Sequence, residues 1–190
     1  MLNKKNFEDM ESYIKQEDAQ RETLLNRARV VLKNSKAAIY SIHRKELEKA
    51  KEYIDECENI IVELRKISEK YPHLTSHIDN ALEEYCEACV FYGFVKNKEL
   101  PTNMDLKLDP ISYLGGLSDL TGELGRRAVL EATARNKSEV QDIRDLIDEI
   151  YGAFIRFDLR NGDLRKKADA IKWNLNKVEE LLYDLNKKDR

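Results

Sequence analysis

The last part of the chain carries an apolar seam that runs without a break from residue 164 to residue 185. Its members follow one another in alternating steps of four and three: Leu164, Ala168, Ile171, Leu175, Val178, Leu182 and Leu185. This spacing keeps all of them on one side of an α-helix, whereas a strand would need alternation at every second residue. The segment therefore predicts a long helix that packs against a partner helix, either in this chain or in a second one.

The same helical rhythm occurs upstream. Residues 6–44 place Leu24, Ala28, Val31, Ser35, Ala38 and Ile42 on one face, and residues 45–70 repeat the pattern up to Tyr71-Pro72. Further helices are predicted over 76–98, from 109 or 110 to 134, and from a capping box at Ser138 to residue 159, with a helix stop at Asn161. Only seven Gly and three Pro interrupt 190 residues. We expect an all-α fold, an elongated antiparallel bundle of six or seven helices in one domain (1–190) that assembles into a higher oligomer.

Charge and cysteine content restrict the ligands that the chain can bind and the cellular compartment in which we expect it. The formal net charge is only -3, so any nucleic-acid contact must come from a local basic patch. The odd number of cysteines argues against a disulfide framework, and Cys86 and Cys89, inside a predicted helix, are interpreted as small buried thiols. The N-terminal stretch lacks the apolar core of a secretory signal, and no run approaches the ~18 apolar residues of a membrane span. These features predict a cytoplasmic protein that makes no membrane contact.

Four carboxylates lie on two of the predicted helices. Glu84 and Glu87 are three residues apart, and Asp119 and Glu123 are four apart, so each pair shares a helical face. Apolar neighbours place these faces near the core, where carboxylates are costly unless a cation neutralises them. An all-oxygen ligand set suits magnesium, with manganese as an alternative, and such an ion can activate water for attack on phosphorus.

Spacing alone does not establish a metal site. In a chain with 36 Asp and Glu residues, a solvated helix face is the ordinary origin of such pairs. The segment from Glu83 to Glu87 also satisfies the EExxE pattern of all-α nucleoside triphosphate pyrophosphohydrolases, although their downstream ExxD is replaced here by DxxxE.

Four segments carry a resemblance to a known family. LEEYCEACVFYGF and ISYLGGLSDLTGELGRRAV contain the four acids, SKAAIYSIHR precedes them, and NGDLRKKADAIKWNLNKVEELLYDL follows. Together they make the chain, from about residue 29 to 185, similar to the translin family. The acidic segments resemble those of its translin-associated factor X (TRAX) branch, and the C-terminal segment resembles translin itself.

The resemblance implies a function. It places the family's catalytic and metal-binding acids on Glu84, Glu87, Asp119 and Glu123, with magnesium-dependent endonucleolytic cleavage of single-stranded RNA as the activity. It also implies a homo-oligomer, an octameric shell that encloses RNA or single-stranded DNA. The alternative within the same family is a translin-like protein that binds single-stranded RNA or DNA without cutting it.

A basic stripe is the candidate RNA contact. Within an arc of about 100° the first helix carries Arg29, Lys33, Lys36, Tyr40, His43 and Arg44, so phosphates could follow the charges while Tyr40 stacks on a base. Arg126 and Arg127, one turn after Glu123, form a second candidate contact. A solvated face that pairs with neighbouring acids is the competing interpretation.

Overall fold

The protein is an elongated bundle in which all the regular structure is helical. The computed structural model describes residues 2–159 and 162–188, and over these residues it contains six α-helices, one 3-10 helix and no strand. In chain order they are α1 (Lys4–His43), α2 (Leu47–Lys70), η1 (Pro72–His77), α3 (Asp79–Asn97), α4 (Pro110–Thr133), α5 (Lys137–Phe154) and α6 (Asp163–Lys188). The predicted fold class is confirmed.

Local signals set most helix ends. Pro72 follows the end of α2, where a proline cannot continue the helical hydrogen bonding. Asp109 caps α4 by accepting hydrogen bonds from the backbone N–H groups of Ile111 and Ser112, and Pro110 occupies the first turn, as expected.

The fifth helix differs from its prediction at both ends. Its N-cap is Asn136, whose side chain accepts from the backbone N–H of Glu139, so Ser138 lies inside the first turn and the predicted capping box is wrong. An Asn two residues earlier satisfies the same free N–H groups. The helix ends at Phe154, before residue 159. The stop predicted at Asn161 lies outside the described residues.

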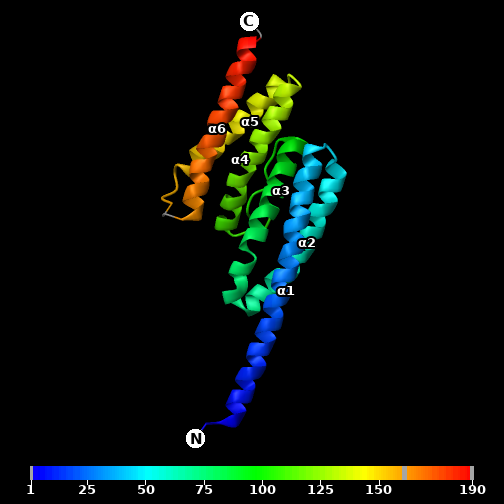
Figure 1. Cartoon of the computed structure of the whole chain (residues 1–190), viewed down its shortest axis with the longest axis vertical. Coiled ribbons are helices and arrows are strands. Elements are labelled where there is room, and N and C mark those ends of the chain that lie inside the picture. The colour runs from blue at the N-terminus through cyan, green and yellow to red at the C-terminus, as the bar shows by residue number, and fades with distance from the viewer. Residues whose placement is uncertain (1, 160–161, 189–190) are drawn as a thin grey trace.

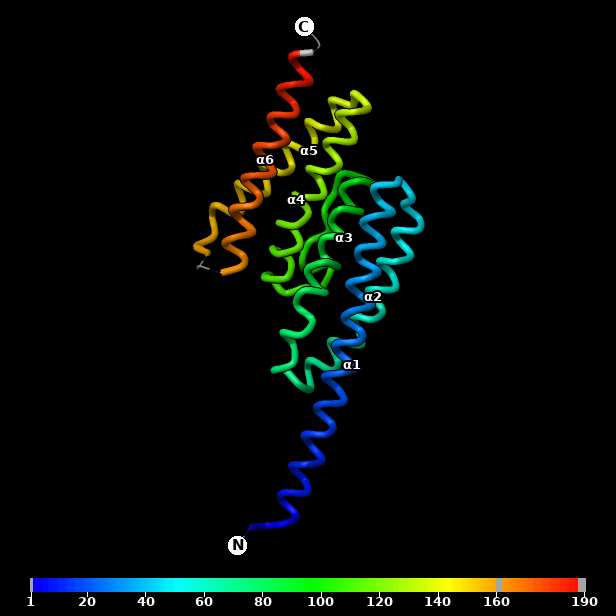
Figure 2. The backbone as a smooth tube through the Cα atoms, in the orientation of Figure 1, coloured from blue at the N-terminus to red at the C-terminus, as the bar shows by residue number. Residues whose placement is uncertain are grey.

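The α1/α2 pair, α3, α4 and the α5/α6 pair form successive layers, with α1 next to α3 (Figure 1). Figure 2 shows α1 and α2 side by side as an antiparallel pair, with α3 next to them. Helix α4 packs on α3, and both α5 and α6 pack on α4. The seam of α6 buries Ile171, Leu175, Val178 and Leu182, so its partner helices are α4 and α5 of the same chain. None of the described helices is long and apolar enough to cross a membrane.

The first half of α1 extends beyond the rest of the bundle (Figure 1). Its apolar side chains Phe7, Met10, Tyr13 and Ile14 are each about half exposed. An isolated stretch of helix this short is marginal in water, because most helix stability in proteins comes from packing of an apolar face. The projecting arm (residues 4–16) meets the bundle where Tyr13 faces Tyr71, just before Glu17 pairs with His73. A partner that covered the exposed apolar side chains of this arm would add stability.

Candidate active site

Gly116 brings α3 and α4 into near backbone contact, and Gly115 beside it leaves room for the Glu83 side chain. A Cβ atom built on Gly116 would lie 2.5 Å from Cys86 Cβ and 2.6 Å from the carbonyl oxygen of Glu83. A Cβ atom on Gly115 would lie 2.6 Å from the side-chain carboxyl carbon of Glu83. The helix axes can come this close because Gly116 carries no side chain. The acids on the facing sides of α3 and α4 are brought together as a result.

Glu87 is the centre of the acidic cluster. It is only 8% exposed, and burial together with the negative charges of Asp119, Glu84 and Glu123 raises its pKa from 4.5 to about 8. Each of the other three predicted acids therefore lies close enough to act on Glu87 electrostatically. The structure brings all four side chains into one cluster between α3 and α4, in which Glu87 holds a proton at neutral pH.

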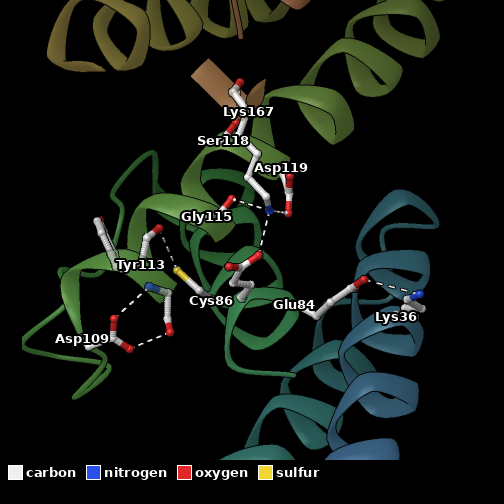
Figure 3. A network of polar contacts seen from close by, with 11 residues as sticks. Lys36, Glu84, Cys86, Asp109, Tyr113, Gly115, Ser118, Asp119 and Lys167 are labelled. Atoms are coloured by element: carbon white, nitrogen blue, oxygen red, sulfur yellow. Dashed lines mark hydrogen bonds and ion pairs between the residues drawn. The ribbon is translucent and has the colours of Figure 1, made fainter. Parts of the chain in front are cut away.

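The other three acids each contact a basic side chain. Lys36 on α1 is 3.4 Å from Glu84 (Figure 3). On α4, Glu123 accepts a hydrogen bond of 2.5 Å from Nε2 of His43 and is 3.6 Å from Arg126. The hydrogen bond from His43 lowers the pKa of Glu123 below its usual range, and the positive charge of Arg126 lowers it further. Burial acts in the opposite direction but is outweighed.

Asp119 contacts a lysine that was not among the predicted site residues. Lys167, near the start of α6, donates to Asp119 at 2.5 Å and to Glu83 at 2.7 Å. Burial alone would lower the pKa of Lys167, but its hydrogen bonds to these two carboxylates raise it above the usual value. Lys167 stands next to Ala168 of the apolar seam, and this position at the edge of a buried face is the one signal that the sequence offers. The signal for Glu83 is its place in the EExxE pattern.

The cluster suits a divalent cation by its chemistry but not by its present geometry. Asp119, Glu84 and Glu123 lie within electrostatic reach of Glu87, and carboxylate oxygens are the ligands that magnesium or manganese prefers. Across residues 2–159 and 162–188, however, no three His, Cys, Asp or Glu side chains stand close enough to hold one metal ion. Ion pairs with basic residues of α1, α4 and α6 hold the carboxylates instead.

The predicted basic stripe separates into two groups. The side chains of Arg29, Lys33, Lys36, Tyr40 and Arg44 are exposed along α1. His43 is not part of this face, because its side chain is only 4% exposed and its ring packs 4.9 Å from that of Phe91. Its hydrogen bond to Glu123 joins α1 to the acidic cluster instead.

The two arginines of α4 also differ from each other. Arg127 is buried and pairs with Glu131 at 3.5 Å and Glu139 at 3.0 Å, so it joins α4 to α5. Arg126 is exposed and lines a groove of 570 Å³ between α4 and α6. In the same groove Lys177 lies 3.3 Å above the ring of the exposed Trp173.

The three cysteines are free and buried, as predicted for Cys86 and Cys89. Burial raises the pKa of both thiols, so neither is a thiolate at neutral pH. Their helix packs them as small apolar residues, and Cys86 donates to the carbonyl oxygen of Tyr113 at 3.6 Å. We assign them no role in metal or redox chemistry.

Fold and site together define an all-helical protein that carries a carboxylate cluster between two tightly packed helices, with basic side chains from three helices around it. A model of the translin family matches residues 19–186. The chain therefore belongs to the translin family, as the sequence resemblance predicted.

Individual relatives come from both branches of the family. Chicken (Gallus gallus) translin is 39% identical over 79 residues, which are 42% of this chain and 34% of translin, so the match spans about a third of that relative. Mouse (Mus musculus) translin-associated protein X is 27% identical over 142 residues, 57% of this chain and 49% of the relative. The protein MJ0175 of Methanocaldococcus jannaschii is 26% identical over 173 residues, 88% of this chain and 77% of that protein.

Solved structures of C3PO proteins share the whole fold. The crystal structure of apo-NeC3PO superposes with a TM-score of 0.91 at 26% identity, and the match covers 97% of this chain and 98% of the NeC3PO chain. The structure of the AfC3PO–duplex RNA complex superposes with a TM-score of 0.86 at 22% identity, and the match covers 95% of this chain and 96% of the AfC3PO chain. This match shows that the two proteins share a fold.

Proposed function

We propose that this chain is a metal-dependent endoribonuclease of the TRAX-like branch that cleaves single-stranded RNA in the cytoplasm. Glu84, Glu87, Asp119 and Glu123 would hold the metal ion, magnesium or manganese. The observation that carries the proposal is the buried Glu87, whose pKa is raised to about 8 by burial and by the other three acids. A protein gains no stability from such a cluster, which is most economically explained as a cation site.

Residues in and around the acidic cluster would have separate roles in the proposed cleavage of RNA. When bound, a magnesium ion would activate water and stabilise negative charge on the phosphate oxygens. Glu87 would give up its proton on entering the ligand set, and His43 would keep Glu123 oriented through its hydrogen bond of 2.5 Å. Arg126, exposed beside Glu123, would hold a phosphate oxygen.

Two surfaces favour single-stranded RNA as the ligand. The exposed part of the α1 stripe combines basic side chains with Tyr40, and the groove between α4 and α6 combines Arg126 and Lys177 with Trp173. Aromatic side chains stack on bases only where the base faces are accessible, as they are in single strands. Single-stranded DNA has the same accessible bases and is proposed as a second ligand.

The projecting arm supports a homo-oligomer, and we propose the octamer that the family resemblance implies. Phe7, Met10 and Ile14 lie on one side of this arm and are exposed in the isolated chain. Contact with a neighbouring subunit would bury them and add apolar area to the interface.

A translin-like binding protein without turnover is the second candidate function. The ion pairs of Glu84, Asp119 and Glu123 favour it, because paired acids can be purely structural. Binding with a steep salt dependence and no cleavage would support this candidate. The pyrophosphohydrolase alternative stays a prediction, which release of pyrophosphate from nucleotides would test.

The decisive experiment compares Asp119→Asn and Glu123→Gln with the unaltered chain on end-labelled single-stranded RNA. We expect magnesium-dependent cleavage that stops in EDTA and falls about a hundredfold or more in either variant. Glu52→Gln, an exposed acid on α2, is the matched control and should cleave normally. If both site variants keep full magnesium-dependent activity, the site assignment is wrong.

A further inference from the structure

One lysine of α6 enters the acidic cluster. Nζ of Lys167 lies 2.5 Å from Asp119 Oδ2 and 3.5 Å from the carbonyl oxygen of Gly115 (Figure 3). It also lies 2.7 Å from Glu83 Oε2. An ammonium group has three donors, and all three have an oxygen acceptor here. Lys167 therefore occupies the acidic cluster much as a bound cation would.

This contact conflicts with the role proposed for Asp119. A metal ligand must offer its oxygen to the ion, but Oδ2 of Asp119 accepts a short hydrogen bond from Lys167. A divalent ion and an ammonium group on the same carboxylate repel each other at this distance. Asp119 therefore cannot accept the hydrogen bond from Lys167 and bind a metal ion equally well at the same time.

The surroundings allow the side chain to move without the helix. The hydroxyl of Ser118 donates to the backbone carbonyl of Lys167 at 3.0 Å and fixes α6 to α4 at this residue (Figure 3). The side chain beyond it is a flexible four-carbon stem, and it is 24% exposed. Its ammonium can therefore turn from the carboxylates to an anion that arrives from solvent.

We propose that Lys167 is a phosphate-binding residue that exchanges Asp119 for a phosphate of the RNA, so that RNA and metal bind cooperatively. This inference rests on the proposed metal-dependent function. Before RNA binds, the ammonium competes with the metal for Asp119. Once a phosphate takes the ammonium, Asp119 is available to the ion. By linkage, the metal must then strengthen RNA binding by the same factor that RNA strengthens metal binding.

The test measures manganese binding by calorimetry, with and without a phosphorothioate single-stranded oligouridylate that resists cleavage. For the unaltered chain we expect the oligonucleotide to tighten manganese binding about tenfold, within the usual range of coupling between two sites. A methylphosphonate oligonucleotide, which has no backbone charge, should leave manganese binding unchanged.

Without oligonucleotide, Lys167→Met should bind manganese about tenfold more tightly than the unaltered chain does. Adding the oligonucleotide should change the manganese affinity of this variant by less than about twofold. Lys166→Met is the matched control, because the neighbouring Lys166 is exposed and pairs with Asp163 on its own helix, away from the cluster. It should behave as the unaltered chain does. Lys167→Gln repeats the test should the methionine variant fold poorly, as monitored by its circular dichroism.

The outcomes separate this inference from the proposed function. If the unaltered chain binds manganese but Lys167→Met binds it equally or more weakly, or keeps the tenfold coupling, the role of Lys167 is refuted and the metal site stands. If neither the chain nor its lysine variants bind manganese, both proposals fail.

Discussion

Replacing Glu87 with Gln should stabilise the metal-free protein. The carboxyl of Glu87 titrates near 4.5 when it is exposed and at about 8 in the fold, because burial and three neighbouring acids oppose its charge. The folded state therefore keeps a proton that the unfolded state loses as the pH rises from 4.5 to about 8. Folding stability falls through this window, and the penalty is complete once the pH exceeds the folded-state pKa.

The size of the effect follows from the shift. Each pKa unit corresponds to about 1.4 kcal/mol, so the raised pKa of Glu87 lowers the free energy of unfolding by about 1 kcal/mol at pH ~5, about 3 kcal/mol at pH ~7 and close to ~5 kcal/mol above pH ~8. Gln has nearly the same shape and no charge. The variant should therefore gain these amounts over the unaltered chain, and the gain should increase with pH.

Urea unfolding followed by far-ultraviolet circular dichroism, in chelator at several pH values from about 5 to 9, measures the difference. Glu52→Gln, with the exposed acid on α2, serves as the control and should change stability by less than about 0.5 kcal/mol at any of these pH values. A Glu87→Gln variant that is less stable than the unaltered chain, or whose advantage does not grow with pH, would refute the electrostatic account of the cluster.

Three further perturbations test other parts of the structure. Gly116→Ala should destabilise the fold by about 1–3 kcal/mol through overpacking and should weaken manganese binding. Gly125→Ala, whose added Cβ meets no atom of another element within 4 Å, should change neither the stability nor the manganese affinity. Denaturant unfolding measures the stability of both variants, and calorimetry measures their manganese binding. Phe7→Glu combined with Ile14→Glu should shift the protein to smaller species in light scattering, and an unchanged mass would exclude the arm from the interface. Trp173→Ala should weaken binding of single-stranded RNA by about 1–3 kcal/mol in a fluorescence titration, and equal affinities would exclude stacking there.

The helices were predictable because their signals are local. The apolar seam of α6 and the proline after α2 each act within a few residues, and each appears in the structure as expected. The start of α4, predicted at residue 109 or 110, is at Pro110, with Asp109 as its cap. The start of α5 was missed because Asn136 and Ser138 are both good caps, and sequence alone does not decide between neighbouring candidates.

The acidic cluster was predictable in its members but not in its contacts. Helical spacing and family resemblance identified the four acids, since residues three or four apart share a face. The contacts of His43 with Glu123 and of Lys167 with Asp119 join residues 80 and 48 positions apart. Such pairs depend on how helices pack, so a basic residue that shares a helical face with exposed neighbours can still turn inward in the fold.

The glycine pair of α4 bears on how such a site could be built or lost. Gly115 and Gly116 contribute no ligand and no charge, yet the missing methyl group of Gly116 allows the two acidic faces to lie close together, and that of Gly115 leaves room for the Glu83 side chain. Grafting the four acids onto another helical bundle would not reproduce the cluster unless its helices met at an equally small contact. Conversely, a single methyl group at Gly116 would push the two helices apart and separate the acids, although none of the four acids would have been replaced.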